Sequence, residues 1–131
     1  MKNSRTCSSA VVQVETIYPW DPAKTDFYFE LLNNSLKQLE QHSGMTLSSL
    51  GEFRRKAAKT TTANQDVYGE LFYIPQITKP CSVLKEFVRK AVSWSKDIPR
   101  VVLACRCETP VEIYKVNPPR EGDKPSSSRN L

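Results

Sequence analysis

The first question for this chain is whether any of its side chains can perform acid–base or nucleophilic chemistry. Its 131 residues include a single histidine, His42. A catalytic histidine needs a partner within hydrogen-bond reach, and no Ser/His/Asp or Cys/His spacing provides one. The four glycines are isolated, so the sequence has no glycine-rich phosphate loop. We therefore predict no catalytic residue, no cofactor and no enzyme activity, and we expect His42 to be an exposed residue near a helix end.

The four cysteines, Cys7, Cys81, Cys105 and Cys107, are the next reactive group. Cys105 and Cys107 are two residues apart in a strand-like segment, so their side chains share a face. This spacing fits no common zinc pattern, and we predict no metal site. An even count is compatible with two disulfides, but a chain that reads as intracellular and forms its own core argues against them. We predict instead that Cys81, Cys105 and Cys107 are small buried apolar residues.

A basic run is the best candidate for contact with RNA phosphates. The net charge is +5, which permits such contact without requiring it. Four cations gather beside three threonines whose hydroxyls could also reach phosphate oxygens, namely Arg54, Arg55, Lys56 and Lys59. The alternative is a solvated loop, and the residues alone leave both interpretations open.

Periodicity predicts the elements that must position these residues. Asp21 and Pro22 are typical of a helix start, and Gly44 of a helix end, so we predict a helix over 22–41. A second apolar stripe of helical period predicts a helix over Cys81–Lys96. The predicted strands are 11–17, 67–74, Arg100–Cys107 and Val111–Val116. Residues 46–53 fit either a strand or a helical turn, and 54–66 reads as a loop or an irregular strand end.

This order of elements predicts the fold class and the domain limits. The fold is α/β of the mixed α+β kind, with two main helices on one small mixed sheet. One domain is expected over 11–116, between a flexible N-terminus at 1–10 and a disordered C-terminal tail at 117–131. Residues 1–10 are too short and polar for a signal peptide, and no apolar run is long enough to span a membrane. We therefore expect an intracellular protein.

The strand Val111–Val116 carries apolar residues on both of its faces. Val111 and Ile113 share one face, and Tyr114 and Val116 share the other. A strand near the end of a chain often lies at a sheet edge, where it can add to a partner's sheet. The alternative is an interior strand covered by the protein's own helices, and both remain open.

Four segments together resemble a known family. Phe72–Ile77, Cys81–Lys96, Val101–Ala104 and Val111–Val116 are similar to the small, fifteen-kilodalton accessory subunits of the eukaryotic tRNA-splicing endonuclease. The resemblance implies an endonuclease C-terminal-domain-like fold and a non-catalytic structural subunit that supports removal of introns from precursor tRNA. The catalytic subunits of that family carry a histidine just before the second helix. The corresponding stretch here, 75–82, has none, so no catalytic residue is implied.

The same resemblance implies partners and a location. The partners would be the other subunits of the endonuclease, with precursor tRNA contacted through the complex. The implied partner-binding residues are Glu108, from the acidic-loop position, and Val111, Ile113, Tyr114 and Val116, from the last strand. The implied location is the nucleus, with the cytoplasm or a cytoplasmic organelle surface as the alternative. The alternative function is a small basic RNA-binding subunit of a ribonucleoprotein that uses the run from Arg54 to Lys59.

Overall fold

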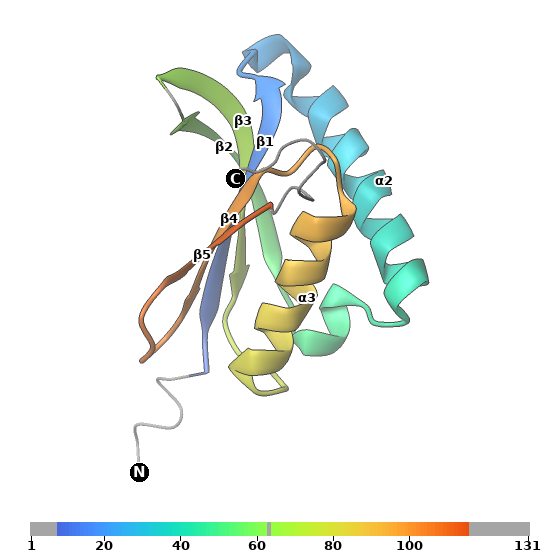
Figure 1. Ribbon diagram of the computed structural model, residues 1–131, viewed down its shortest axis with the longest axis vertical. Coiled ribbons are helices and arrows are strands. Elements are labelled where there is room, and N and C mark those ends of the chain that lie inside the picture. Colours follow the sequence, from blue (N-terminus) through green and yellow to red (C-terminus); the bar gives the residue numbers. More distant parts are fainter. Residues whose placement is uncertain (1–7, 63, 116–131) are drawn as a thin grey trace, which may run out of the picture.

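The computed structural model describes residues 8–62 and 64–115, which form two layers: a five-stranded sheet and two helices on one of its faces (Figure 1). The strands are β1 (Ala10–Pro19), β2 (Arg54–Thr62), β3 (Gln65–Ile74), β4 (Arg100–Cys105) and β5 (Val111–Tyr114). The helices are α2 (Thr25–Ser43) and α3 (Cys81–Trp94). This confirms the predicted mixed α+β class. All neighbouring strands are antiparallel, however, so the sheet is not the mixed one expected.

The strand order is β2-β3-β1-β4-β5. The first six elements therefore follow the split β-α-β pattern of ferredoxin-like folds, and β5 adds to β4 as a final hairpin strand. Each helix connects two strands that have another strand between them, and the two crossovers return over the same face of the sheet. The opposite face has no helix on it (Figure 1). Folds of this kind host many unrelated functions, so the function has to be argued from the site.

The ends of α2 follow the signals that predicted them. The Asp21 carboxylate accepts a hydrogen bond from the Ala23 N–H at 3.0 Å, and Pro22 begins a short 3-10 turn that leads into the helix. At the other end Gly44 has φ of 75°, and its N–H donates to the Glu40 carbonyl at 2.9 Å. A residue in this left-handed backbone conformation is usually glycine, and it ends the helix.

The segment between α2 and β3 differs from the prediction. Leu47–Leu50 is one 3-10 turn, so of the two structures considered for 46–53 the helical one is present. The expectation of a loop or an irregular strand end over 54–66 is wrong, because β2 pairs with β3 in an unbroken register from Arg54 opposite Tyr73 to Thr62 opposite Gln65. Threonine is β-branched and favours strands, and an edge strand can carry polar residues on both of its faces.

The domain begins earlier than predicted. The carbonyls of Ser8 and Ser9 accept hydrogen bonds from the N–H groups of Ile77 and Arg106, at 2.6 and 2.9 Å. Residues 8–10 therefore belong to the folded domain instead of the flexible N-terminus expected there. The predicted tail, 117–131, lies outside the described residues.

One core fills the space between the sheet and the helices. The strands contribute inward-facing residues at alternate positions, such as Val12, Phe72 and Leu103, which are all buried. Leu39 of α2 and Leu84 of α3 close over them. The period of two in β1 is the alternation that predicted this strand, and β4, which was predicted from its apolar run as a largely buried strand, has the same period.

Candidate functional site

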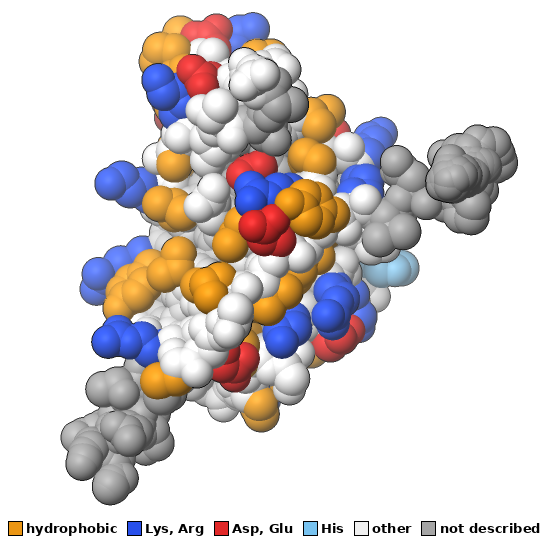
Figure 2. All heavy atoms as spheres, turned by 60° about the vertical axis from the view of Figure 1, so that its left-hand side comes forward, with side chains coloured by type: hydrophobic (Ala, Val, Ile, Leu, Met, Phe, Trp, Pro, Cys, Tyr) orange, Lys and Arg blue, Asp and Glu red, His pale blue; other side chains and the backbone are white. Residues whose placement is uncertain are grey.

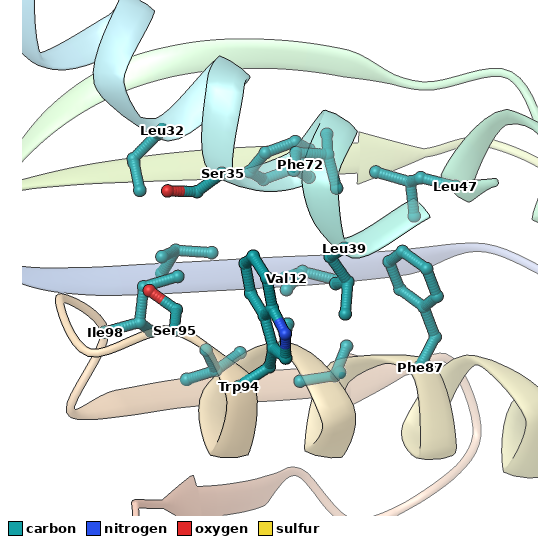
Figure 3. Close-up of a pocket in the computed structure, with 15 residues that line it drawn as sticks. Val12, Leu32, Ser35, Leu39, Leu47, Phe72, Phe87, Trp94, Ser95 and Ile98 are labelled. Atoms are coloured by element: carbon teal, nitrogen blue, oxygen red, sulfur yellow. The ribbon is translucent and has the colours of Figure 1, made fainter. Parts of the chain in front are cut away.

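The two helices lie on the sheet without filling all the space beneath them. A cavity of about 70 Å³ remains between α2, α3 and the sheet (Figure 3). Protein interiors are packed closely, and voids larger than a water molecule are few. The space is therefore the first candidate for a binding site. Its walls include Val12, Leu32, Leu39, Phe72, Phe87 and Val88.

Short side chains on the facing sides of the helices leave this space. Ser35 of α2 and Ala91 of α3 both line the cavity and are both half-buried. Figure 3 shows the Ser35 side chain on one side of the space, with Ser95, from the segment after α3, on the other. A larger residue at either helix position would fill volume that is now empty.

One end of the cavity is bordered by the Trp94 ring, which His42 contacts from outside the cavity. His42, near the end of α2, stacks on Trp94, at the end of α3, with ring centroids 6.2 Å apart and planes 28° apart. Trp94 lines the cavity and is nevertheless 39% exposed. It is therefore a wall shared by the cavity and the solvent, and it marks the route by which a ligand could enter. His42 itself is exposed, as predicted.

The cavity has the chemistry of a hydrocarbon site. None of its lining side chains is titratable, and its polar side-chain groups are the hydroxyls of Ser35 and Ser95 and the indole N–H of Trp94. The Ser95 oxygen already accepts a hydrogen bond from the Asp97 N–H at 3.2 Å. A water molecule needs roughly 10–15 Å³ and two or more polar partners, so the space is large enough for water but poorly suited to it. Apolar cavities of this sort take small apolar molecules.

A buried ion pair lies under the first half of α2, and neither of its two residues lines the cavity. Arg55 donates to the Glu70 carboxylate from Nε at 2.9 Å and from Nη2 at 2.7 Å, and from Nη1 to Asn33 at 2.9 Å. The second Glu70 oxygen accepts from the Tyr68 hydroxyl at 2.5 Å. Burial, and then this hydrogen bond, raise the pKa of Tyr68. The Arg55 guanidinium also lies 3.9 Å from the Phe29 ring centre. These contacts join β2 and β3 to α2.

The four cations predicted to contact RNA do not form one surface. The side chain of Arg55 is 11% exposed and is held by Glu70, which is 0% exposed. Arg54 and Lys56 are exposed. They lie opposite Tyr73 and Leu71 of β3, so their side chains point to the helix-free face. Lys59 is exposed on the other side of the strand. The sequence signal for this separation is that alternate residues of a strand face opposite sides of the sheet. The expectation that 54–66 is not a regular strand obscured this signal.

The predicted partner-binding strand does lie at a sheet edge, because β5 ends the strand order. Ile113 is buried and Val111 half-buried on the helix side, while Tyr114, on the other side, is 56% exposed. Glu108 is exposed in the turn before the strand. Val116 lies outside the described residues. That this strand binds a partner stays a prediction.

The helix-free side of β5 carries a charged cluster that sequence analysis did not identify. Arg100 forms ion pairs with Glu15, which is buried, and with Glu112, at 3.3 Å in the second case. The hydrogen bond from Tyr114 and the charge of Arg100 hold the pKa of Glu112 below its usual range. Residues from β1, β4 and β5 are thereby joined across the sheet, a proximity that only the strand register reveals.

Cys81, Cys105 and Cys107 are disulfide-bonded, so the prediction that they are small buried apolar residues is wrong. Cys81 and Cys105 form a disulfide that spans 24 residues, with Cα atoms 6.5 Å apart. Cys107 is disulfide-bonded as well. Helix α3 and strand β4 run in opposite directions, so the first residue of the helix lies beside the last residue of the strand. The sequence signal was therefore a cysteine at the start of one element and another at the end of the next.

A metal site and a helix that could span a membrane are both absent from residues 8–62 and 64–115. No group of three or more His, Cys, Asp or Glu side chains in these ranges is placed to hold a metal ion. Neither helix there combines the length and the apolar composition needed to cross a bilayer.

Comparison with known proteins bears on the identity of the chain. No curated protein and no solved structure matches it. The family model described as "Secreted clade V proteins" matches residues 10–112, which is most of the sequence.

The family match corrects the resemblance to a tRNA-splicing endonuclease subunit, and the endonuclease-like refinement of the fold is not confirmed. A family of secreted proteins conflicts with a role in intron removal and with a ribonucleoprotein role. It conflicts equally with endonuclease subunits or precursor tRNA as partners and with a nuclear or cytoplasmic location. The motifs behind the resemblance are short apolar runs, which specify burial in a strand or helix instead of a particular family. The chain belongs to the secreted clade V proteins.

Proposed function

We propose that this protein is a secreted, non-enzymatic binding protein whose cavity between α2 and α3 takes a small apolar group of its ligand. The observation that carries the proposal is the cavity itself, a space of about 70 Å³ between the helices and the sheet that opens to solvent beside Trp94. A well-formed apolar pocket is the first place to expect a ligand.

Two independent observations support an extracellular role. The family is described as one of secreted proteins. The Cys81–Cys105 bridge is a kind of bond that forms and persists in oxidising compartments and is rare in the cytosol. A bridge that closes part of the chain also keeps a small domain folded outside the cell.

The composition of the cavity favours binding over reaction. Catalysis of acid–base type needs a titratable group near the reacting atoms, and the walls of the cavity contain none. An apolar group that enters gains the free energy of leaving water and displaces little ordered water, because the walls offer few polar partners. The volume is about half of the 150 Å³ in which an engineered apolar cavity holds benzene, so it suits a short alkyl chain or one edge of a ring that belongs to a larger ligand.

The test uses Trp94 as a reporter and bromobenzene as a probe, because bromine quenches tryptophan fluorescence on contact. Trp20→Phe leaves Trp94 as the single tryptophan, since the chain has two. Trp20 lies beside Tyr68, with ring centroids 6.5 Å apart, and does not line the cavity. We expect saturable quenching in this variant. Trp94→Phe, which leaves Trp20, should show quenching that only rises linearly with bromobenzene.

A matched pair of leucine variants completes the test. Ala91→Leu fills the cavity and should weaken saturable binding by at least about tenfold, or roughly 1.4 kcal/mol. Gln38→Leu adds the same side chain on the exposed side of α2 and should leave binding within about twofold. Saturable quenching that survives Ala91→Leu, or that never appears up to the solubility limit of bromobenzene, would contradict the proposal.

A further inference from the structure

The side chains on the helix-free face of the sheet form a regular pattern. The strand registers arrange its side chains in three transverse rows, which together are called the open face. The first row is Arg54, Tyr73, Val11 and Ala104; the second is Lys56, Leu71, Gln13, Val102 and Glu112; the third is Ala58, Gly69, Glu15, Arg100 and Tyr114. Figure 2 shows a side of the molecule where apolar side chains lie between groups of Lys and Arg.

The middle of the open face is apolar although it is exposed to solvent. An antiparallel sheet with one solvated face normally carries polar residues there. Here the central strands instead present Val11 and Tyr73, which are 39% and 42% exposed, beside Leu71 and Val102. Val11 lies directly between Tyr73 and Ala104, and Leu71 and Val102 flank Gln13 in the next row. Contiguous exposed apolar residues of this kind mark interaction sites.

The charges around this apolar centre are not balanced. Arg100 is neutralised by Glu15 and Glu112, the two acids in the three rows. Arg54 and Lys56, on the β2 side, are exposed and form no ion pair with any residue that the structure describes. The open face therefore has an apolar centre, a cationic rim along β2 and, toward β5, a cluster of one cation and two acids with a net formal charge of −1.

We infer that the open face is a docking surface for another protein whose own surface has an apolar patch bordered by carboxylates. Charge complementarity selects this occupant, because Arg54 and Lys56 need acidic partners and a rim of opposite charge steers association. A second copy docked through the same face offers these two cations a net formal charge of only −1, because Arg100 pairs with both Glu15 and Glu112. A lipid surface fits less well. Proteins that bind lipid surfaces insert long apolar side chains into the bilayer, whereas Leu71, Val102 and Ala104 at the centre of the open face are half-buried.

The test selects ligands without assuming a partner. A library of random displayed peptides is enriched on the immobilised full chain, and the winners are sequenced and titrated against variants. We expect peptides that combine aromatic or aliphatic residues with Asp or Glu. Arg54→Glu with Lys56→Glu should weaken them by at least about tenfold. Arg89→Glu with Lys90→Glu, which reverses two exposed charges on α3, should change binding by less than about twofold.

A second variant addresses the apolar centre, and thermal unfolding verifies that each variant is folded. Val102→Asp should abolish binding of the selected peptides. Ala91→Leu, which fills the separate cavity, should not affect it, so failure here is distinguishable from failure of the cavity proposal. Selected peptides without acids, or equal binding by the rim variant, would overturn the inference. Two other results would also overturn the inference, provided that Val102→Asp abolishes them. One is concentration-dependent dimerisation in sedimentation, and the other is co-sedimentation with phosphatidylserine vesicles.

Discussion

Val11 and Val12 are neighbours in β1, yet they meet opposite surroundings. Val12 is 5% exposed beneath the helices, while Val11 is 39% exposed on the open face. The same contrast separates Arg55, which is held by Glu70 in the interior, from Arg54, which has no such partner on the other side. One sheet thus carries apolar side chains on both of its faces, of which its own helices cover only one. The difference indicates that burial within the chain accounts for the helix side, while the open face retains apolar surface that a partner can cover.

The largest expected effect comes from breaking the buried ion pair. Arg55→Ala leaves the fully buried Glu70 carboxylate without its counter-charge, which should lower the free energy of unfolding by about 3–5 kcal/mol. Arg54→Ala, one residue away on the open face, should change it by less than about 0.5 kcal/mol. Urea denaturation of both variants measures the contrast. Equal effects would show that the two faces do not differ as described.

Removal of the Cys81–Cys105 bridge should rank next. The double change Cys81→Ser and Cys105→Ser opens a loop of 24 residues and should destabilise the domain by about 3 kcal/mol. The measurement is thermal unfolding of the two proteins without reductant. An unchanged midpoint would mean that the bridge does not constrain the unfolded chain, and the support it gives to an extracellular role would weaken.

A matched valine pair compares the two faces directly. Val12→Ala removes two methyl groups from the core and should cost about 2 kcal/mol, from lost burial and the enlarged cavity. Val11→Ala removes the same groups from a partly exposed site and should cost less than about 1 kcal/mol. Denaturant midpoints give both values. A larger cost at Val11 would place an unrecognised contact on the open face.

The smallest effect concerns the cavity. Ala91→Leu should raise the free energy of unfolding by about 1 kcal/mol, because a cavity-filling residue adds contacts without displacing packed atoms. Gln38→Leu, on the outer side of α2, serves as the control and should have no comparable effect. Destabilisation by Ala91→Leu would indicate that the space is too small or too rigid for a side chain, and therefore also for a ligand group.

Local signals predicted the elements whose limits depend on nearby residues. Asp21, Pro22 and Gly44 determine the ends of α2 by capping and by backbone conformation, which act within one turn. The apolar stripe of α3 and the alternation in β4 and β5 also extend over a few residues, and those elements were predicted with ends within two residues of the observed ones. Strand β2 was missed because its basic and threonine-rich sequence has no apolar face.

Features that depend on tertiary contacts could not be predicted in this way. The pairing of Cys81 with Cys105 follows from the packing of α3 on β4, and the cavity follows from Ser35 and Ala91, which are ordinary residues within a helix. The open face required the strand registers, since Arg54, Tyr73 and Val11 are far apart in sequence. The endonuclease resemblance failed because its motifs reported burial, which many folds share.

The most direct test of the central claim is a methyl NMR titration of the Val- and Leu-labelled protein with bromobenzene. The sheet supplies its own controls, because Val12 and Val101 line the cavity while their neighbours Val11 and Val102 lie on the open face. We expect saturable shifts of the Val12, Val14 and Val101 methyl signals and unchanged Val11 and Val102 signals. Shifts confined to Val11 and Val102, or no saturable shift at the cavity valines, would contradict the claim that the space between the helices is a binding site.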